Sequence, residues 1–266
     1  MTIYSGFLVN STKNILNVLK KFQVILYFAK SDTEARYRRS VLGPFWLTLG
    51  TVIGVLGLGV IWSQILNIES AEFVPNLTIG LICWQLFSGC VVESPSVFVR
   101  YTSVIRNSPQ PFIFYPVLLV SRYFVNFAHN FIIIIGVLLF YQTPFNVNIL
   151  LFFPFLFLVL INLVFLSLIL GVIGARFRDL EPTIASIMPL LFFVTPIFYK
   201  PSQIKIASWV IDFNPMTYYI AVIREPLLGS TLNAEIVYGF SIITIVVVGF
   251  GLFLLNAKKH RLAFWL

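Results

Sequence analysis

The sequence predicts an all-α membrane protein with six transmembrane helices. Its composition points to a membrane, because 59% of the residues are hydrophobic, only 11% are charged and the mean hydropathy is +0.93. A single soluble core of 266 residues cannot bury that much apolar surface. The apolar residues also form long continuous runs, whereas membrane strands would show short alternating segments. Helices are therefore the predicted spanning elements.

Residues 1–44 precede the spans and predict an interfacial region. Apolar side chains recur at helical spacing between residues 13 and 30, opposite lysine and asparagine side chains, as in a helix that lies in the membrane interface. The apolar stripe is Ile15, Val18, Leu19, Phe22, Ile25, Leu26 and Ala29. The alternative is a soluble amphipathic helix packed on another domain. The segment lacks the basic start and apolar core of a cleavable signal.

Six stretches are long and apolar enough to cross a bilayer, which takes about 17 to 25 helical residues. They cover residues 45–66, 77–93, 113–141, 149–173, 183–199 and 236–256. We therefore expect residues 1–266 to form one transmembrane domain, with a six-span bundle over 45–256 and a short tail over 257–266.

A dense cationic cluster stands immediately before the first span. Arg36, Arg38 and Arg39 are followed within a few residues by the apolar run that begins at Phe45 and Trp46. The positive-inside rule places such a cluster on the cytoplasmic side of the membrane. The junction therefore predicts on which side the first span begins.

Glycines mark two spans for close helix contact. Gly50 and Gly54 form a G-x-x-x-G pattern in the first span, and Gly171 and Gly174 lie near the end of the fourth. The pattern does not name the helix that each pair contacts. Residues 174–182 are then expected to form a tight turn of mixed charge, with a proline suited to starting the next helix.

The connection between the second and third spans predicts a short amphipathic helix on the cytoplasmic side. Ser94 can cap a helix that Pro95 begins, and Pro109 and Pro111 end it. Its apolar stripe is Val97, Phe98, Tyr101, Val104 and Ile105, and its polar stripe is Ser96, Arg100, Ser103 and Asn107. Glu93, at the inner end of the second span, is expected to pair with a nearby arginine. Such a helix either transmits force from a docked partner or anchors two spans.

The chain between the fifth and sixth spans, residues 200–234, is too apolar for a free loop. Asn214-Pro215 divides it into halves that are each too short to cross the membrane. We interpret it as two short re-entrant helices in the outer half of the bilayer. The alternative is an interfacial loop on lipid headgroups, which its Trp and Tyr content would suit.

The distribution of cations predicts the orientation. In the six-span arrangement all lysines and arginines except Lys200, Lys205 and Arg224 fall on one side, so both termini are expected in the cytoplasm. The net charge of +8 follows from this bias toward the anionic inner leaflet. Nucleic-acid binding is therefore not needed to explain it.

The residues give little support to enzyme chemistry. Two cysteines and two histidines, His129 and His260, stand too far apart in the sequence for a metal site. Paired carboxylates, a Ser-His-Asp set and a phosphate-binding G-x-x-x-x-G-K-[ST] loop are all missing. A secondary carrier would show intramembrane ion-coupling groups and internal repeats, and neither is evident.

Several motifs together resemble the permease subunits of ABC-2 type exporters, and most closely those that export O-antigen and related lipid-linked polysaccharides. They are the junction at 36–46, Arg178-Asp179-Leu180, Thr195-Pro196-Ile197-Phe198-Tyr199 and Asn214-Pro215. The resemblance covers essentially the whole chain. It implies a six-span fold, a homodimer that encloses a channel in the bacterial inner membrane, and two copies of a separate nucleotide-binding ATPase subunit. ATP and Mg would bind to that partner, so no cofactor is expected in this chain.

The implied cargo is a polysaccharide on an undecaprenyl-type lipid. Alternatives are export of a teichoic acid, a capsule, a drug or a small lipid, and, from another class, an intramembrane glycosyl- or acyltransferase. The resemblance makes the connection between spans two and three the coupling helix. The expected coupling residues are Glu93, Ser94, Pro95, Arg100, Tyr101 and Arg106.

Two further sets of residues are candidates for contact with the substrate. Arg36, Arg38 and Arg39 could attract the pyrophosphate of the lipid-linked substrate. Aromatic rings could contact sugars weakly at many points along a channel. The candidate channel residues are Phe45, Trp46, Trp62, Phe198, Tyr199, Tyr218 and Tyr219.

Overall fold

A computed structural model of the protein describes residues 18, 20–37, 40, 45–107, 110–144, 146–199 and 208–257, without the side chains of 32–37, 47, 208, 256 and 257. All regular secondary structure in these residues is helical, which confirms the predicted all-α class.

Five of the described helices are long and apolar enough to cross a membrane. They are α3 (Phe45–Leu66), α4 (Ser70–Glu93), α7 (Phe114–Phe140), α8 (Phe152–Arg176) and α12 (Ala234–Ala257). α3 has the limits predicted for the first span. α4 begins at Ser70 rather than residue 77, because its first turns carry polar residues that the apolar run excludes. α8 follows a short 3-10 helix, η2 (Val147–Leu151).

The helix in the position of the predicted fifth span is short. α9 (Leu180–Val194) has 15 residues, about 22 Å of helix at 1.5 Å per residue, against a hydrocarbon core of about 30 Å. The helix ends because Pro196 disfavours helical backbone at Thr195, whose ψ is 135°. Residues 195–198 continue beyond it without helix and are buried. The span predicted over 183–199 is thus helical only in its first part.

Two short helices, α10 (Ser208–Asp212) and α11 (Pro215–Leu227), precede α12. Asn214 caps α11 by accepting a hydrogen bond from the Met216 N–H at 3.0 Å, and Pro215 occupies the first helical turn. Asn214-Pro215 therefore starts a helix as well as dividing the segment. α11 packs against α4, α8 and α12, with Ile220, Val222 and Ile223 fully buried.

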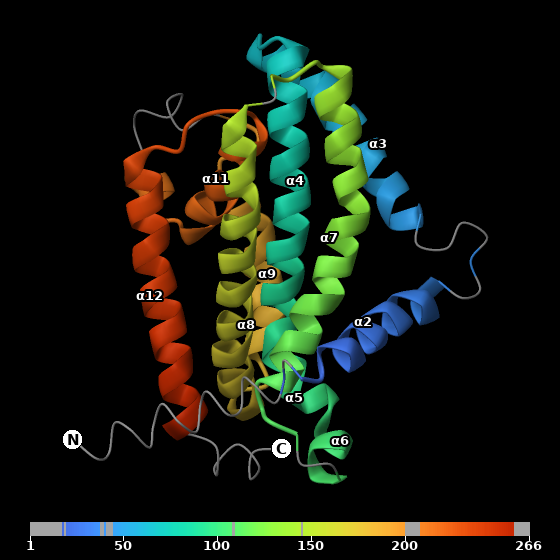
Figure 1. The fold of residues 1–266 in the computed structure, drawn as a ribbon, viewed down its shortest axis with the longest axis vertical. Coiled ribbons are helices and arrows are strands. Elements are labelled where there is room, and N and C mark those ends of the chain that lie inside the picture. The colour runs from blue at the N-terminus through green and yellow to red at the C-terminus, as the bar shows by residue number, and fades with distance from the viewer. Residues whose placement is uncertain are drawn as a thin grey trace.

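The bundle is organised around α4, the most buried of the long helices. α4 packs against α3, α7, α8, α9 and α11, while α12 packs against α8 and α11 at one side of the bundle (Figure 1). The outward faces of α3 and α12 carry exposed apolar side chains such as Ile53, Ile61, Ile242 and Ile245. Exposed apolar faces on helices of this length are typical of contact with lipid.

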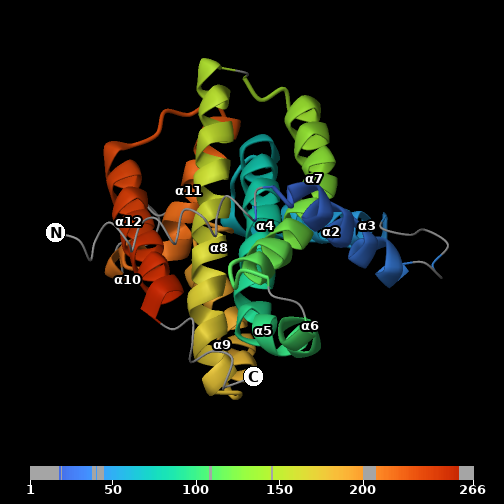
Figure 2. The same ribbon diagram turned by 60° about the horizontal axis from the view of Figure 1, so that its bottom comes forward.

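The chain between α4 and α7 forms one end of the bundle, called here the basic end because Arg100, Arg106, Arg176 and Arg178 lie there. It consists of a 3-10 helix, η1 (Ser94–Ser96), and two short helices, α5 (Val97–Arg100) and α6 (Thr102–Asn107), beside the α8–α9 connection (Figure 2). The prediction of one helix begun by a Ser94 cap is wrong. Backbone helicity runs on from α4, and the Ser94 hydroxyl donates backwards to the Cys90 carbonyl. The opposite end, which carries α10 and α11, is the remote end (Figure 1).

α2 (Phe22–Tyr37) confirms a helix over the described part of residues 13–30 and extends beyond it. Val18, just before α2, and Ile25 and Ala29 are buried against α7, while Phe22, Tyr27 and Phe28 remain exposed. Ile15 and Leu19 of the predicted stripe lie outside the described residues.

Candidate functional site

A spacious concave surface lies between α4, α7 and α9 and is called here the α4–α9 groove. Its volume is about 560 Å³ and it is open along one side. α4 contributes Trp84, Gln85 and Ser88, and α9 contributes Phe192 and Phe193. The wall therefore combines aromatic faces with amide and hydroxyl groups.

Aromatic rings continue from the groove toward the remote end. The Trp84 and Phe192 ring centroids are 5.4 Å apart, and those of Phe192 and Phe198 are 4.8 Å apart in an edge-to-face pair. Phe198 also stacks on Trp62 of α3 at 5.7 Å. Such aromatic pairs stabilise the fold by more than the burial of their apolar area alone would. They fix the short segment after α9 against both α9 and α3.

A row of side-chain hydrogen bonds crosses the middle of the bundle at Gln85. Its amide nitrogen donates to the Thr51 hydroxyl at 3.1 Å, and its amide oxygen accepts from the Asn130 side chain at 2.8 Å. These contacts join α3, α4 and α7 by side-chain hydrogen bonds. They orient Gln85, which is itself exposed to the groove.

An ion cluster closes the groove at the basic end. The Glu93 carboxylate pairs with Arg122 of α7 and with Arg100 of α5, the latter at 2.7 Å, and Tyr123 hydrogen-bonds to the same carboxylate. Arg100 also reaches Glu181, at the start of α9, at 3.4 Å. We call Glu93, Arg100, Arg122 and Glu181 the basic-end cluster. The predicted pairing of Glu93 with nearby arginines is confirmed, and Arg100 joins the ends of two groove helices.

The joint between α4 and α5 is packed tightly on α8. Ser94 is fully buried, and its hydroxyl oxygen is hydrogen-bonded to the Ser167 hydroxyl of α8 at 2.7 Å. A Cβ atom at Gly174 would overlap the carbonyl of Pro95, and one at Gly171 would lie 2.6 Å from Val97. The contact that Gly171 and Gly174 predicted is therefore with η1 and α5. Gly50 and Gly54 have no atom within 4 Å of such a Cβ among the described residues.

The remaining coupling residues lie on the same short helices. Tyr101 stands between α5 and α6 with its ring 5.4 Å from that of Tyr115, and Arg106 is exposed on α6. Arg38 and Arg39 lie outside the described residues, as does the side chain of Arg36 in α2. Their predicted contact with pyrophosphate stays a prediction.

The seven candidate channel aromatics are not brought together. Phe45 and Trp46 are exposed at the start of α3, whereas Trp62, Phe198 and Tyr199 meet near the remote end of the groove. Tyr218 donates to the Asp212 carbonyl at 2.8 Å. Tyr219 is 2% exposed, packs between Phe87 and Phe240 and donates to Asn162, so it belongs to the protein core.

Apart from Glu93, the polar and aromatic residues that line the groove were not singled out from the sequence. They are Trp84, Gln85, Ser88, Tyr123, Phe192 and Phe193. A glutamine within an otherwise apolar span was an available signal. The aromatic residues gave no such signal, because a ring in an apolar helix can face either lipid or a partner helix.

The sequence model of the ABC-2 type transporter family matches residues 23–228. The chain belongs to the ABC-2 type transporter family. The matched region contains every residue that we name in the groove and in the basic-end cluster. This ABC-2 chain is therefore a multi-pass membrane transport component.

Relatives of this ABC-2 chain carry a more specific name. A Klebsiella pneumoniae protein named O-antigen export system permease protein RfbA is 26% identical over 258 residues, which cover 95% of this chain and 98% of that protein. A second protein of that name from the same organism is 25% identical over 255 residues, with the same coverage. A Myxococcus xanthus protein of that name is 23% identical over 247 residues, 90% of this chain and 94% of its own.

Proposed function

We propose that this chain is the transmembrane subunit of an ATP-driven exporter that moves a lipid-linked, O-antigen-like polysaccharide across the inner membrane. The names of relatives that align over almost the whole chain support the substrate class. The open α4–α9 groove is the observation that carries the mechanism.

The groove suits a sugar polymer because of its lining. Apolar faces of sugar rings can pack on Trp84 and Phe192, while hydroxyl groups find the amide of Gln85 and the hydroxyl of Ser88. A polar chain cannot cross the membrane along a surface open to lipid. A second copy of the protein would close the groove, so the transporting unit is a homodimer with a channel between its subunits.

Energy for transport comes from a separate ATPase subunit, present in two copies and carrying ATP and Mg. The docking site is α5 and α6 at the basic end, which lies in the cytoplasm together with both termini. Arg100 supports this assignment, because it connects α5 to the ends of α4 and α9 through Glu93 and Glu181. A displacement of α5 would thus act directly on two walls of the groove.

The fifth of the six spans consists of α9 together with the non-helical residues 195–199, of which 195–198 are buried. Irregular backbone at membrane depth is tolerated where protein covers it. α10 and α11 are then the re-entrant pair at the outer side. The burial of one face of α11 among α4, α8 and α12 supports this arrangement.

Arg36, Arg38 and Arg39 would receive the pyrophosphate of the lipid-linked substrate at the cytoplasmic entrance. Neutralising all three should reduce export more than membrane insertion. A parallel decrease in export and insertion would leave the cluster with a role in topology alone.

Deleting the gene and locating the polymer tests the function. We expect lipid-linked polysaccharide to accumulate in the cytoplasm and to disappear from the cell surface, with recovery on expression of the intact gene. Normal surface polymer in the deletion strain, combined with altered drug tolerance or lipid composition, would assign the groove to a small amphiphile instead.

A further inference from the structure

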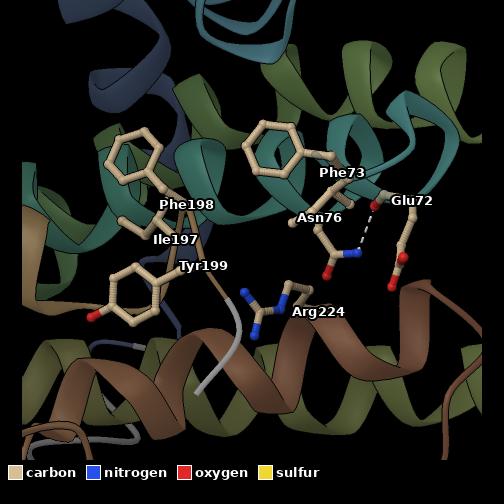
Figure 3. Close-up of a pocket in the computed structure, with 8 residues that line it drawn as sticks. Glu72, Phe73, Asn76, Ile197, Phe198, Tyr199 and Arg224 are labelled. Carbon is tan, nitrogen blue, oxygen red and sulfur yellow. Dashed lines mark hydrogen bonds between the residues drawn. The ribbon is translucent and has the colours of Figure 1, made fainter. Parts of the chain in front are cut away.

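A second, smaller pocket lies at the remote end, between the start of α4, residues 197–199 and α11. Its volume is about 30 Å³, roughly the space of one or two water molecules. Glu72, Asn76, Phe198, Tyr199 and Arg224 line it (Figure 3). None of the roles described above uses this pocket.

Arg224 is the notable group in the pocket because its guanidinium is buried. The residue is only 7% exposed. Its Nη1 donates to the Pro196 carbonyl at 2.8 Å, and its Nε lies 3.7 Å from the Glu225 carboxylate without a hydrogen-bond partner among the described residues. A guanidinium carries five N–H donors, and leaving them unsatisfied in a buried place costs free energy. Among the described residues, the hydrogen bond to Pro196 and the ion pair with Glu225 leave further guanidinium N–H groups for a polar group that enters the pocket.

The opposite wall of the pocket supplies acceptors. Asn76 donates its amide N–H to the Glu72 backbone carbonyl at 2.8 Å, and Figure 3 shows its side-chain oxygen turned toward Arg224. The Glu72 carboxylate also lines the pocket. A carboxylate disfavours a bound anion, but it accepts a hydrogen bond from a hydroxyl group. A hydroxyl can in the same place accept a hydrogen bond from the guanidinium.

The aromatic residues connect this pocket with the α4–α9 groove. Phe198 lines the pocket and also packs against Phe192 of the groove wall and Trp62 of α3. The Tyr199 hydroxyl donates to the Val194 carbonyl at 2.6 Å, which holds its ring at the pocket rim. Donor, acceptor and ring faces side by side match the chemistry of a sugar edge.

We propose that this pocket binds the hydroxyl edge of one sugar unit of the exported chain, through Arg224, Glu72 and Asn76. The proposal rests on the proposed export function and adds a defined contact at the far end of the path. The small volume admits one or two hydroxyl groups and excludes a whole sugar ring. A polymer held there after each step would be hindered from sliding back.

The test measures binding of short fragments of the strain's own polysaccharide, released by mild acid, to the purified full-length protein in lipid nanodiscs. Saturation-transfer NMR reports the contact, and inorganic phosphate serves as the competing anion probe. Arg224 is left intact, because its substitution would also release Pro196. The variants are Glu72→Gln and Asn76→Leu, with Glu69→Gln as the control of equal charge change at an exposed position outside the pocket.

We expect Glu72→Gln and Asn76→Leu each to weaken fragment binding about five- to tenfold, while Glu69→Gln and added phosphate leave it unchanged. Tighter binding of phosphate in Glu72→Gln, with phosphate displacing the fragments, would identify an anion site and overturn the proposal. So would equal binding by all variants, or no binding to the intact protein in a strain whose deletion mutant accumulates polymer. Failure of the deletion to affect the polymer would instead reject the export function itself.

Discussion

At Gly174 the absence of a single side-chain atom decides how closely η1 can approach α8. A Cβ there would overlap the backbone of Pro95, which has no flexible side chain that could move aside. The residue before Pro95, Ser94, is hydrogen-bonded to Ser167 about two turns earlier in α8. Gly174 therefore controls the joint from which α5 extends.

We predict that Gly174→Val destabilises the protein by about 1–3 kcal/mol, because overpacking forces η1 away from α8. Thermal unfolding of the detergent-purified protein measures the effect. Gly136→Val is the matched control, since a Cβ at Gly136 of α7 meets nothing within 4 Å. Equal losses in both variants would mean that the helical environment, and not the contact with Pro95, sets the cost.

The Glu93–Arg122 ion pair is a second local contribution to stability. Both side chains are largely buried, at 18% and 14% exposure, so removing one leaves the other charge poorly solvated. We predict that Glu93→Gln and Arg122→Gln each cost about 1–3 kcal/mol and that the double variant costs less than their sum. Unfolding in a double-mutant cycle measures the coupling. Additive costs would show that the two charges do not stabilise each other.

Among the helices, α5 carries one side chain, Arg100, that bridges acidic groups at the ends of α4 and α9. We predict that Arg100→Gln leaves the protein inserted but lowers transport about fivefold or more relative to ATP turnover, because motion of α5 no longer reaches Glu181. Tyr101→Ala should act in the same direction through its ring contact with Tyr115. ATPase and transport assays on the reconstituted complex measure the ratio.

Ser103→Ala is the control for this pair, since Ser103 is exposed on α6 in the same short connection. An unchanged ratio of transport to ATP turnover in both Arg100→Gln and Tyr101→Ala would remove α5 from the coupling path. A lower ratio in Ser103→Ala as well would point to a general disturbance of the connection.

Elements whose limits depend on local chemistry were predictable from the sequence. α3 begins and ends where its apolar run does, and α11 begins at its Asn-Pro signal. The end of α9 was not predicted, because the sequence remains apolar through Phe198. Pro196 was the local signal for the end of a helix. Ser94 was misjudged because a capping residue requires a break before it, whereas α4 continues into η1.

At the scale of the whole molecule, the α4–α9 groove makes its own prediction. Cysteine at Phe193, which is 64% exposed, should react with a water-soluble thiol reagent, because a path for a hydrated polymer admits water. Cysteine at Tyr219, in the core, should not react. Cysteine at Ile245 should also resist, because α12 presents it to lipid in spite of its 72% exposure. The native Cys83 and Cys90 are buried and give little background.

Labelling at position 245 but not at 193 would place the water-filled path on the other side of the bundle. Labelling of neither would show that the groove stays closed in the resting protein, and the measurement would then be repeated with the ATPase trapped with ATP. Protection of position 193 in that state too would reject the groove as the path.

The residues that line the α4–α9 groove could not be deduced from the sequence, because they depend on how distant helices pack together. Trp84 and Trp62 both lie in long, predominantly apolar helices, yet one lines the groove and the other supports it from α3. Only the packing of helices distant in sequence separates the two roles. Glu93 was recognisable because a charge in a span demands a partner. Its second partner, Arg122, could be identified only from the folded structure.

The early end of α9 also has a consequence for how the protein is made. Residues 195 and 196 receive their side-chain hydrogen bonds from Asn214 and Arg224, which follow 19 and 28 residues later in the chain. Both donors emerge after α9, and they reach residues 195 and 196 only when α11 packs into the bundle. Thr195 and Pro196 must therefore wait beside water or the insertion machinery until α11 arrives. The buried segment that follows α9 is thus completed by a helix that is translated after it.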